Sequence, residues 1–156
     1  MSEFKNSQTA LNLMKAFAGE SQARNRYTYY AGVAKKQGFM QISNFFLETA
    51  ENEKEHAKVF LKKLLEHGMN EEVIVLNDAG YPVALSDDTF KNLEYAANGE
   101  KEEWTELYPA FADMAEKEGY KEDKDQLSKL GIDALVFKHT GLLIKTEVDP
   151  DGDFEI

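Results

Sequence analysis

The feature that most constrains the fold is a helical apolar pattern interrupted by acidic residues, and it is clearest between Met40 and Glu66. Apolar side chains recur there at helical spacing, at Ile42, Phe46, Ala50, Ala57, Phe60 and Leu64. Glu53 and His56 lie on the same stripe, and their i, i+3 spacing directs both side chains from one helix face. A carboxylate on a core face is costly without a cation or a hydrogen-bond partner. A Glu-x-x-His pair that points into a helical bundle is one way to bind iron or manganese, and two exposed helix residues are the alternative.

A second long helix is predicted over residues 9–37, with Ser7 or Thr9 as its cap and Gly38 at its end. Glu20 interrupts its apolar stripe, and an ordinary i, i+4 ion pair with Arg24 is the alternative to a metal-binding role. The full inward stripe is expected to be Leu13, Phe17, Glu20, Arg24, Tyr27, Ala31 and Ala34. Because only a short turn separates this helix from the next, the two are expected to form an antiparallel hairpin.

The stretch from Met69 to Asp88 differs from the helices around it. Val73–Leu76 and Pro82–Leu85 are short apolar pieces, and Asn77–Gly80 between them is a turn signal. This length exceeds a tight helix–helix turn and suits a crossover connection that runs the length of a bundle. A small β-hairpin made from the two apolar pieces is the alternative.

The third helix is expected to start near Ser86–Asp88 and to end at Gly119. Its predicted inward stripe is Phe90, Leu93, Ala97, Glu100, Glu103, Leu107, Phe111 and Met114. Glu100 and Glu103 are again an i, i+3 pair in the middle of an apolar stripe. Pro109 lies inside the helical pattern, so a kink is expected there.

Three successive helices thus lose their apolar stripe near the middle to Glu20, Glu53, His56, Glu100 and Glu103. These residues are expected at comparable depth in an antiparallel bundle. Four carboxylates and an imidazole cannot all be ionised in a core without cations, and two divalent metals would neutralise them. The mixture of oxygen and nitrogen ligands suits iron or manganese better than copper. The alternative, that all five are solvated, requires the stripe assignment to fail on three helices.

Composition excludes several classes of function. The formal net charge of -11 argues against a nucleic-acid backbone or an anionic membrane as partner. The absence of cysteine excludes disulfides, thiolate catalysis, iron–sulfur clusters and cysteine-ligated zinc. The 156 residues suffice for one domain with a sizeable core. No signal peptide and no long apolar run are recognised, so a cytoplasmic location is expected.

Three stretches of the sequence resemble the rubrerythrin family of the ferritin-like superfamily: Ala16–Tyr27, Glu48–Ala57 and Asn98–Pro109. The resemblance extends over residues 9 to about 122. It implies an all-α, ferritin-like four-helix bundle with a long crossover between the second and third helices. It also implies two non-haem iron ions, with manganese or zinc as substitutes, and reduction of hydrogen peroxide to water.

The resemblance assigns roles to individual residues. It makes Glu20, Glu53, His56, Glu100 and Glu103 metal ligands, and it implies that His56 and Glu103 exchange places on one iron as its redox state changes. We hypothesise that Glu53 or Glu103 carries a proton to the leaving hydroxide, which with His56 gives the catalytic set. Tyr27 and Tyr108 match tyrosines that hydrogen-bond ligating carboxylates, and core packing is their alternative role.

Two departures from the family concern the C-terminal part of the chain. The family usually carries a rubredoxin domain with four cysteine ligands, so electrons are expected from a separate donor such as a rubredoxin. The fourth helix should contain another Glu-x-x-His, which residues 129–140 lack. Asp133 is a candidate carboxylate ligand in its place, whereas His139 comes three residues too late and is expected to be exposed. We therefore predict a bundle over residues 1–140 and a divergent acidic tail over 141–156.

Three functional hypotheses remain open from the sequence. The first is a di-iron peroxidase, in which the missing fourth-helix motif is expected to weaken the second metal site and to lower turnover. The second is a metal-binding or iron-handling bundle with an incomplete site and little catalysis, and the third is a metal-free structural bundle. The family resemblance also implies a homodimer, for which exposed Tyr29 and Tyr30 would be a sequence signal unless they are buried within one chain.

Overall fold

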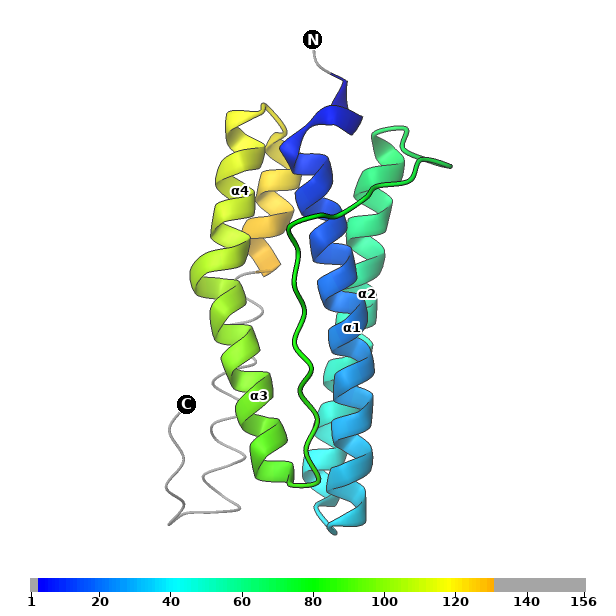
Figure 1. Cartoon of the computed structure of the whole chain (residues 1–156), viewed down its shortest axis with the longest axis vertical. Helices are drawn as coiled ribbons and strands as arrows, with labels where there is room; N and C mark the ends of the chain where they lie inside the picture. The colour runs from blue at the N-terminus through cyan, green and yellow to red at the C-terminus, as the bar shows by residue number, and fades with distance from the viewer. Residues whose placement is uncertain (1–2, 131–156) are drawn as a thin grey trace.

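Two long helices, α1 (Gln8–Lys36) and α2 (Met40–Glu66), form an antiparallel hairpin in a computed structural model that describes residues 3–130 (Figure 1). The Ser7 side chain caps α1 by accepting a hydrogen bond from the backbone N–H of Ala10 at 3.1 Å. Gly38 has φ +87°, a conformation that favours glycine and permits the tight turn into α2. The predicted hairpin and helix ends are confirmed.

The chain then returns along the bundle as an extended crossover, drawn in green beside α1 in Figure 1. Tyr81 donates a hydrogen bond to the Lys15 carbonyl at 3.1 Å, and the Lys15 ammonium pairs with Asp78 at 3.0 Å. Tyr30 of α1 donates to the Ala84 carbonyl at 2.5 Å. Between the helices no described residue forms a strand, so the predicted crossover is confirmed and the alternative hairpin is not.

The third arm of the bundle consists of α3 (Thr89–Glu102), the π-helical turn η2 (Glu103–Leu107) and α4 (Tyr108–Lys117). Asp88 caps α3 by accepting from the Phe90 N–H at 3.0 Å, as expected from the Ser86–Asp88 signal. Gly119 follows α4 with φ +88°. Residues 121–130 form a fourth helix, beside α1 and α4 in Figure 1. The protein is therefore an all-α four-helix bundle with a crossover between α2 and α3.

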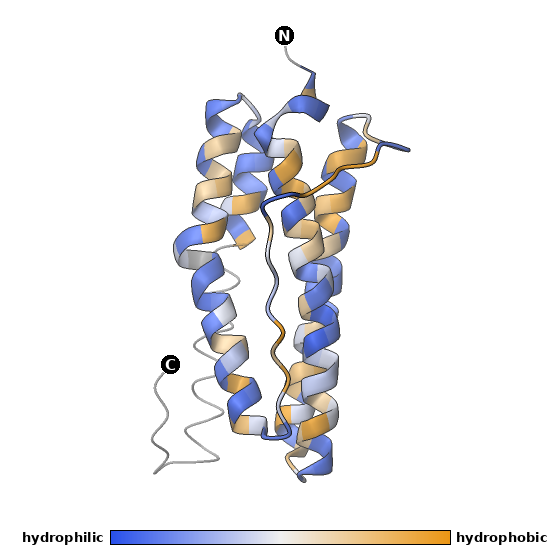
Figure 2. Ribbon diagram, viewed as in Figure 1, coloured by the Kyte–Doolittle hydropathy of each residue, from blue (hydrophilic) through white to orange (hydrophobic). Residues whose placement is uncertain are grey.

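Two apolar clusters make up the core, and the acidic positions of the helices lie between them in the sequence. One cluster contains Leu13, Ala16, Phe60, Leu64, Tyr108, Phe111, Leu127 and Leu130, and the other contains Ala23, Tyr27, Tyr30, Ile42, Phe46, Ala50, Leu93 and Ala96. Figure 2 shows hydrophilic positions between apolar ones along α2 and α3. Glu20 follows Ala16 of the first cluster and precedes Ala23 of the second, so buried glutamates lie where the two clusters meet.

The structure corrects the predicted stripes at several positions. All six apolar residues predicted on the inward face of α2 are buried. On the third arm, however, Leu107 is 37% exposed and Tyr108 is buried, because the π-turn contains one more residue than an α-helical turn. Met114 is only partly buried for the same reason. Tyr30 is fully buried, whereas Tyr29 is exposed, so only Tyr29 remains as a surface aromatic of that pair.

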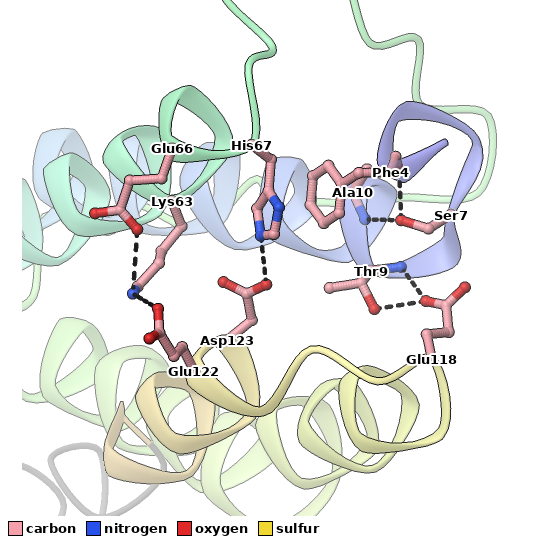
Figure 3. A network of polar contacts seen from close by, with 10 residues as sticks. All are labelled: Phe4, Ser7, Thr9, Ala10, Lys63, Glu66, His67, Glu118, Glu122 and Asp123. Carbon is pink, nitrogen blue, oxygen red and sulfur yellow. Dashed lines mark hydrogen bonds and ion pairs between the residues drawn. The ribbon is translucent and has the colours of Figure 1, made fainter. Parts of the chain in front are cut away.

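A polar network joins three segments at the end of the bundle where the described chain begins (Figure 3). His67, which follows α2, contacts the buried Asp123 with its Nε2 atom 2.8 Å from the carboxylate. The Phe4 ring stacks on His67 at a centroid distance of 3.6 Å. Glu118 accepts hydrogen bonds from the N–H of Thr9 at 2.7 Å and from its hydroxyl at 2.5 Å. The start of α1, the end of α2 and the start of the fourth helix are thereby fixed together.

Several sequence predictions concern residues that the structure does not describe. Asp133, His139 and the tail over 141–156 lie outside the described residues. Within the described part of the chain, no helix is both long and apolar enough to cross a membrane.

Candidate metal centre

Glu20, Glu53 and His56 bring three potential ligand atoms together inside the bundle. His56 Nδ1 lies 3.7 Å from Glu20 Oε2 and 3.8 Å from Glu53 Oε1. Ligand atoms from all three residues lie within 4.8 Å of one another. Glu20 and Glu53 are buried, whereas His56 is partly exposed. The i, i+3 spacing in α2 and the packing of α2 against α1 therefore produce the predicted convergence of these three residues.

Two oxygen atoms in this cluster are buried without a hydrogen bond: Oε2 of Glu20 and Oε2 of Glu53. A buried carboxylate oxygen loses its hydration, and without a hydrogen-bond donor or a cation this loss lowers the stability of the folded protein. A cation bound between the helices would supply the missing partner, so the donor set suits a metal ion. Arg24 does not take that place, because it forms no ion pair with Glu20 and its Nε atom is also unpartnered. The simple Glu20–Arg24 ion pair considered from the sequence is therefore wrong.

Glu100 and Glu103 extend the cluster from the third arm. The pKa of Glu100 is raised to about 8, mainly because the group is buried and secondly because the negative charge of Glu20 lies nearby. Burial and then the charges of Glu100 and Glu20 raise the pKa of Glu103 well above its ordinary value. The Glu103 residue is partly exposed, and it lines a cavity. Without cations, burial thus favours the protonated forms of both carboxyl groups.

Two buried tyrosines connect the arms in a crossed arrangement. Tyr27 of α1 donates a hydrogen bond to Glu100 of α3 at 2.7 Å, and Tyr108 of α4 donates a short hydrogen bond to Glu20 of α1. Each tyrosine follows a glutamate of its own arm, but it binds the glutamate of the other arm. The hydrogen bonds from Tyr27 and Tyr108 to carboxylates agree with the prediction, while the choice of partner was not readable from the sequence.

The π-turn makes this crossed arrangement compatible with the helix spacing. Tyr27 comes seven residues after Glu20, but Tyr108 comes eight residues after Glu100. In a regular α-helix a residue at i+7 is rotated by only about 20° from residue i, whereas one at i+8 is rotated by about 80°. η2 absorbs the extra residue through a hydrogen bond from the Tyr108 N–H to the Glu103 carbonyl. Pro109 assists because it has no N–H to offer to a regular helical bond. At the predicted kink the structure has this π-turn, which ends directly before Tyr108 and Pro109. π-turns of this kind are frequent at functional sites.

Comparison with known proteins identifies the family. The sequence matches the rubrerythrin family model over residues 12–133. The chain belongs to the rubrerythrin family. Rubrerythrin-1 of Clostridium acetobutylicum is 62% identical over 121 residues, which cover 78% of this chain and 61% of that protein. Rubrerythrin of Nitratidesulfovibrio vulgaris is 52% identical over 122 residues, with 78% and 61% coverage. The chain thus spans about three-fifths of the length of these rubrerythrins.

Solved structures support the same ferritin-like fold. Nigerythrin in a mixed-valence state is similar with a TM-score of 0.78 and 29% identity, covering 95% of this chain and 73% of that one. A second nigerythrin structure, described as fully reduced and all ferrous, has a TM-score of 0.77. Membership of the rubrerythrin family suggests a di-iron protein of the oxidoreductase type. The individual ligand roles of Glu20, Glu53, His56, Glu100 and Glu103 stay predictions.

Proposed function

We propose that this chain is a non-haem di-iron peroxidase that reduces hydrogen peroxide to water with electrons from an external donor protein such as a rubredoxin. The observation that carries the proposal is the pair of buried, unpartnered carboxylate oxygens of Glu20 and Glu53 beside His56. Family membership and the likeness to an all-ferrous nigerythrin support iron as the metal. A cytoplasmic homodimer is part of the same proposal.

The metal ions would be held by Glu20, Glu53, His56, Glu100 and Glu103, with Asp133 as a further carboxylate ligand from the fourth helix. When bound, two ferrous ions supply the two electrons and the Lewis acidity that cleavage of the O–O bond needs. Reduction of hydrogen peroxide to two waters also consumes two protons. The protein has to deliver those protons to the oxygen atoms of the substrate.

Glu103 is the better placed of the two proton carriers considered from the sequence. It lines a cavity, and burial beside Glu100 and Glu20 favours its protonated form. Glu53, by contrast, is buried within the cluster. Tyr27 and Tyr108 orient Glu100 and Glu20 through their hydroxyl groups, which fixes the carboxylate positions before any metal binds.

Metal stoichiometry after anaerobic loading with ferrous iron tests the proposal directly. We expect two irons per chain by elemental analysis and peroxide-dependent oxidation of reduced rubredoxin. Glu53→Gln should lose iron, whereas Glu55→Gln, an exposed carboxylate two residues away on α2, should keep it. No bound iron, or equal iron in both variants, would overturn the assignment.

A metal-binding bundle with little catalysis is the second candidate. The observation that favours it is the absence of a second Glu-x-x-His in residues 129–140, where the family has one. One iron per chain together with weak peroxidase activity would support this candidate over a complete di-iron enzyme.

A further inference from the structure

A cavity of about 320 Å³ lies between α1, the third arm and the crossover. Glu103 and the buried Tyr108 line it, and so do the exposed residues Asp78 and Tyr81 of the crossover. Tyr108 also donates a hydrogen bond to Glu20. The cavity therefore extends from the crossover at the surface to a side chain that contacts the carboxylate cluster. Figure 1 shows the crossover lying along this side of the bundle.

Two glycines in the walls of this cavity have backbone conformations that any residue can adopt. Gly19 of α1 and Gly99 of α3 lie inside helices and are not among the glycines with positive φ. Glycine at such a position costs about 1 kcal/mol relative to alanine. A Cβ atom added at Gly99 would meet nothing within 4 Å, and one at Gly19 would meet Tyr81 Cε1 at 3.7 Å. Helix geometry therefore does not require glycine at Gly19 or Gly99, and the absence of side chains there leaves the cavity wider.

A second hollow of about 490 Å³ adjoins the first, and residues of the helices and of the crossover line both: Arg26, Gly80, Tyr81, Pro82, Gly99 and Glu102. It extends the space toward Tyr95 and Asn98 of α3. Gly99 thus lines both hollows, and a side chain added there would extend into the open space beside it.

The lining suits a small hydrogen-bonding molecule. Arg26 donates from Nε to Gln22 at 2.6 Å and from Nη1 to the Tyr30 hydroxyl at 3.1 Å, which holds the guanidinium in place at the cavity wall. Gln22, Arg26 and Glu103 present polar atoms, while Ala16 and Phe111 supply apolar surface. A hydroperoxide offers donors and acceptors to such a lining.

We propose that this cavity is the passage by which a small hydroperoxide reaches the carboxylate cluster, and that the absent side chain of Gly99 sets its width. The passage is inferred from the geometry of the cavity. The identity of the hydroperoxide as the molecule that passes through it rests on the proposed peroxidase function. Gly99 is accordingly a residue that determines which substrates enter, and it takes no part in the chemistry.

The passage can be tested on the metal-free protein, because the sequence has no cysteine. Ala16→Cys places one thiol in the cavity wall, where its reaction with methyl methanethiosulfonate reports access. Adding Gly99→Leu should slow this reaction several-fold. Gly32→Leu is the matched control, since Gly32 is an exposed glycine of α1 with nothing within 4 Å of its added Cβ. Equal labelling rates in the Gly99→Leu and Gly32→Leu backgrounds would overturn the passage.

The identity of the substrate that uses the passage is tested on the iron-loaded protein with two hydroperoxides. Gly99→Leu should lower kcat/KM more for tert-butyl hydroperoxide than for hydrogen peroxide, at unchanged iron content, and Gly32→Leu should change neither. Equal losses for both substrates would refute Gly99 as the width-setting residue. Slowed labelling in a protein that has no peroxidase activity would uphold the passage and refute the proposed function. Gly99→Ala, which adds one methyl group to open space, gives a smaller effect and replaces the leucine variant if that variant misfolds.

Discussion

Burial beside one another distinguishes Glu20, Glu53 and Glu100 from most other carboxylates of the described chain. Glu20, Glu53 and Glu100 are each at most 5% exposed. Such groups stay charged only where a cation or several donors offset the lost hydration. The tyrosine hydroxyls satisfy one oxygen of Glu20 and one of Glu100, and further oxygens of Glu20 and Glu53 remain for a metal.

The raised pKa of Glu100 predicts how the stability of the metal-free protein depends on pH. Its pKa of about 8 in the folded state compares with an ordinary value of 4.5, so the folded state binds more protons between these values. Stability is therefore fully present below about pH 4.5 and is lost as pH rises through about 8. Thermal unfolding of the metal-free protein across this range should show a falling melting temperature.

Glu100→Gln is the control for this pH dependence, because a neutral amide cannot lose a proton. Its melting temperature should fall less steeply with pH than that of the parent, with the remaining slope due to Glu103, whose pKa is raised in the same direction. A parent protein whose stability rises between pH 4.5 and 8 would contradict the assignment of a raised carboxyl pKa.

The Tyr27 hydroxyl offers a second test at the residue scale. Tyr27→Phe removes the donor that supports the charged form of Glu100, so metal affinity should fall, by about 10–100-fold if Tyr27 acts as other residues that hydrogen-bond metal ligands do. Competition with a chelator measures the affinity. Tyr29→Phe, at an exposed position on the same helix, should bind metal as the parent does. Equal affinities in the two variants would exclude a positioning role for Tyr27.

At the scale of the helices, the ends are specified locally. Asp88 precedes α3 and accepts the Phe90 N–H, which would otherwise lack an intrahelical partner. Asp88→Ala should lower the free energy of unfolding by about 1 kcal/mol. Asp87→Ala, which removes an exposed neighbour that does not cap the helix, should change it little. Urea denaturation of both variants measures the difference, and equal losses would mean that the cap contributes nothing.

The π-turn η2 shows how one residue can change which face of a helix points inward. With regular spacing Leu107 would face the core, and the third stripe was predicted on that basis. The turn instead brings Tyr108 to the core and leaves Leu107 at the surface. The result is a second tyrosine–glutamate bond between arms, equivalent to the one that Tyr27 makes.

For the molecule as a whole, the contact between His67 and Asp123 joins α2 to the fourth helix (Figure 3). His67→Ala leaves the buried Asp123 without this partner and removes the Phe4 stacking, so unfolding free energy should fall by about 1–3 kcal/mol. The double variant His67→Ala/Asp123→Ala should lose less than the sum of the two single variants. Strict additivity in chemical denaturation would show that the two residues do not interact.

Most of the fold was readable from the sequence because its signals are local. The periodic apolar residues of α2, the caps at Ser7 and Asp88, and the glycines that follow α1 and α4 act through neighbouring residues only. The same periodicity predicted that Glu20, Glu53 and Glu100 would be buried, because each lies on an apolar stripe. Local periodicity cannot show a π-turn, which is why Leu107 was assigned to the wrong face.

Only the tertiary structure decided which side chains meet across the bundle. Tyr27 binds Glu100 and Tyr108 binds Glu20 because of the axial offset and rotation of the arms, which depend on packing between residues far apart in the sequence. The same packing leaves Arg24 apart from Glu20 and opens the cavity beside Gly99 under the crossover. The sequence by itself determined the helices and the identity of the buried acids, whereas their partners and the space around them depend on nonlocal geometry.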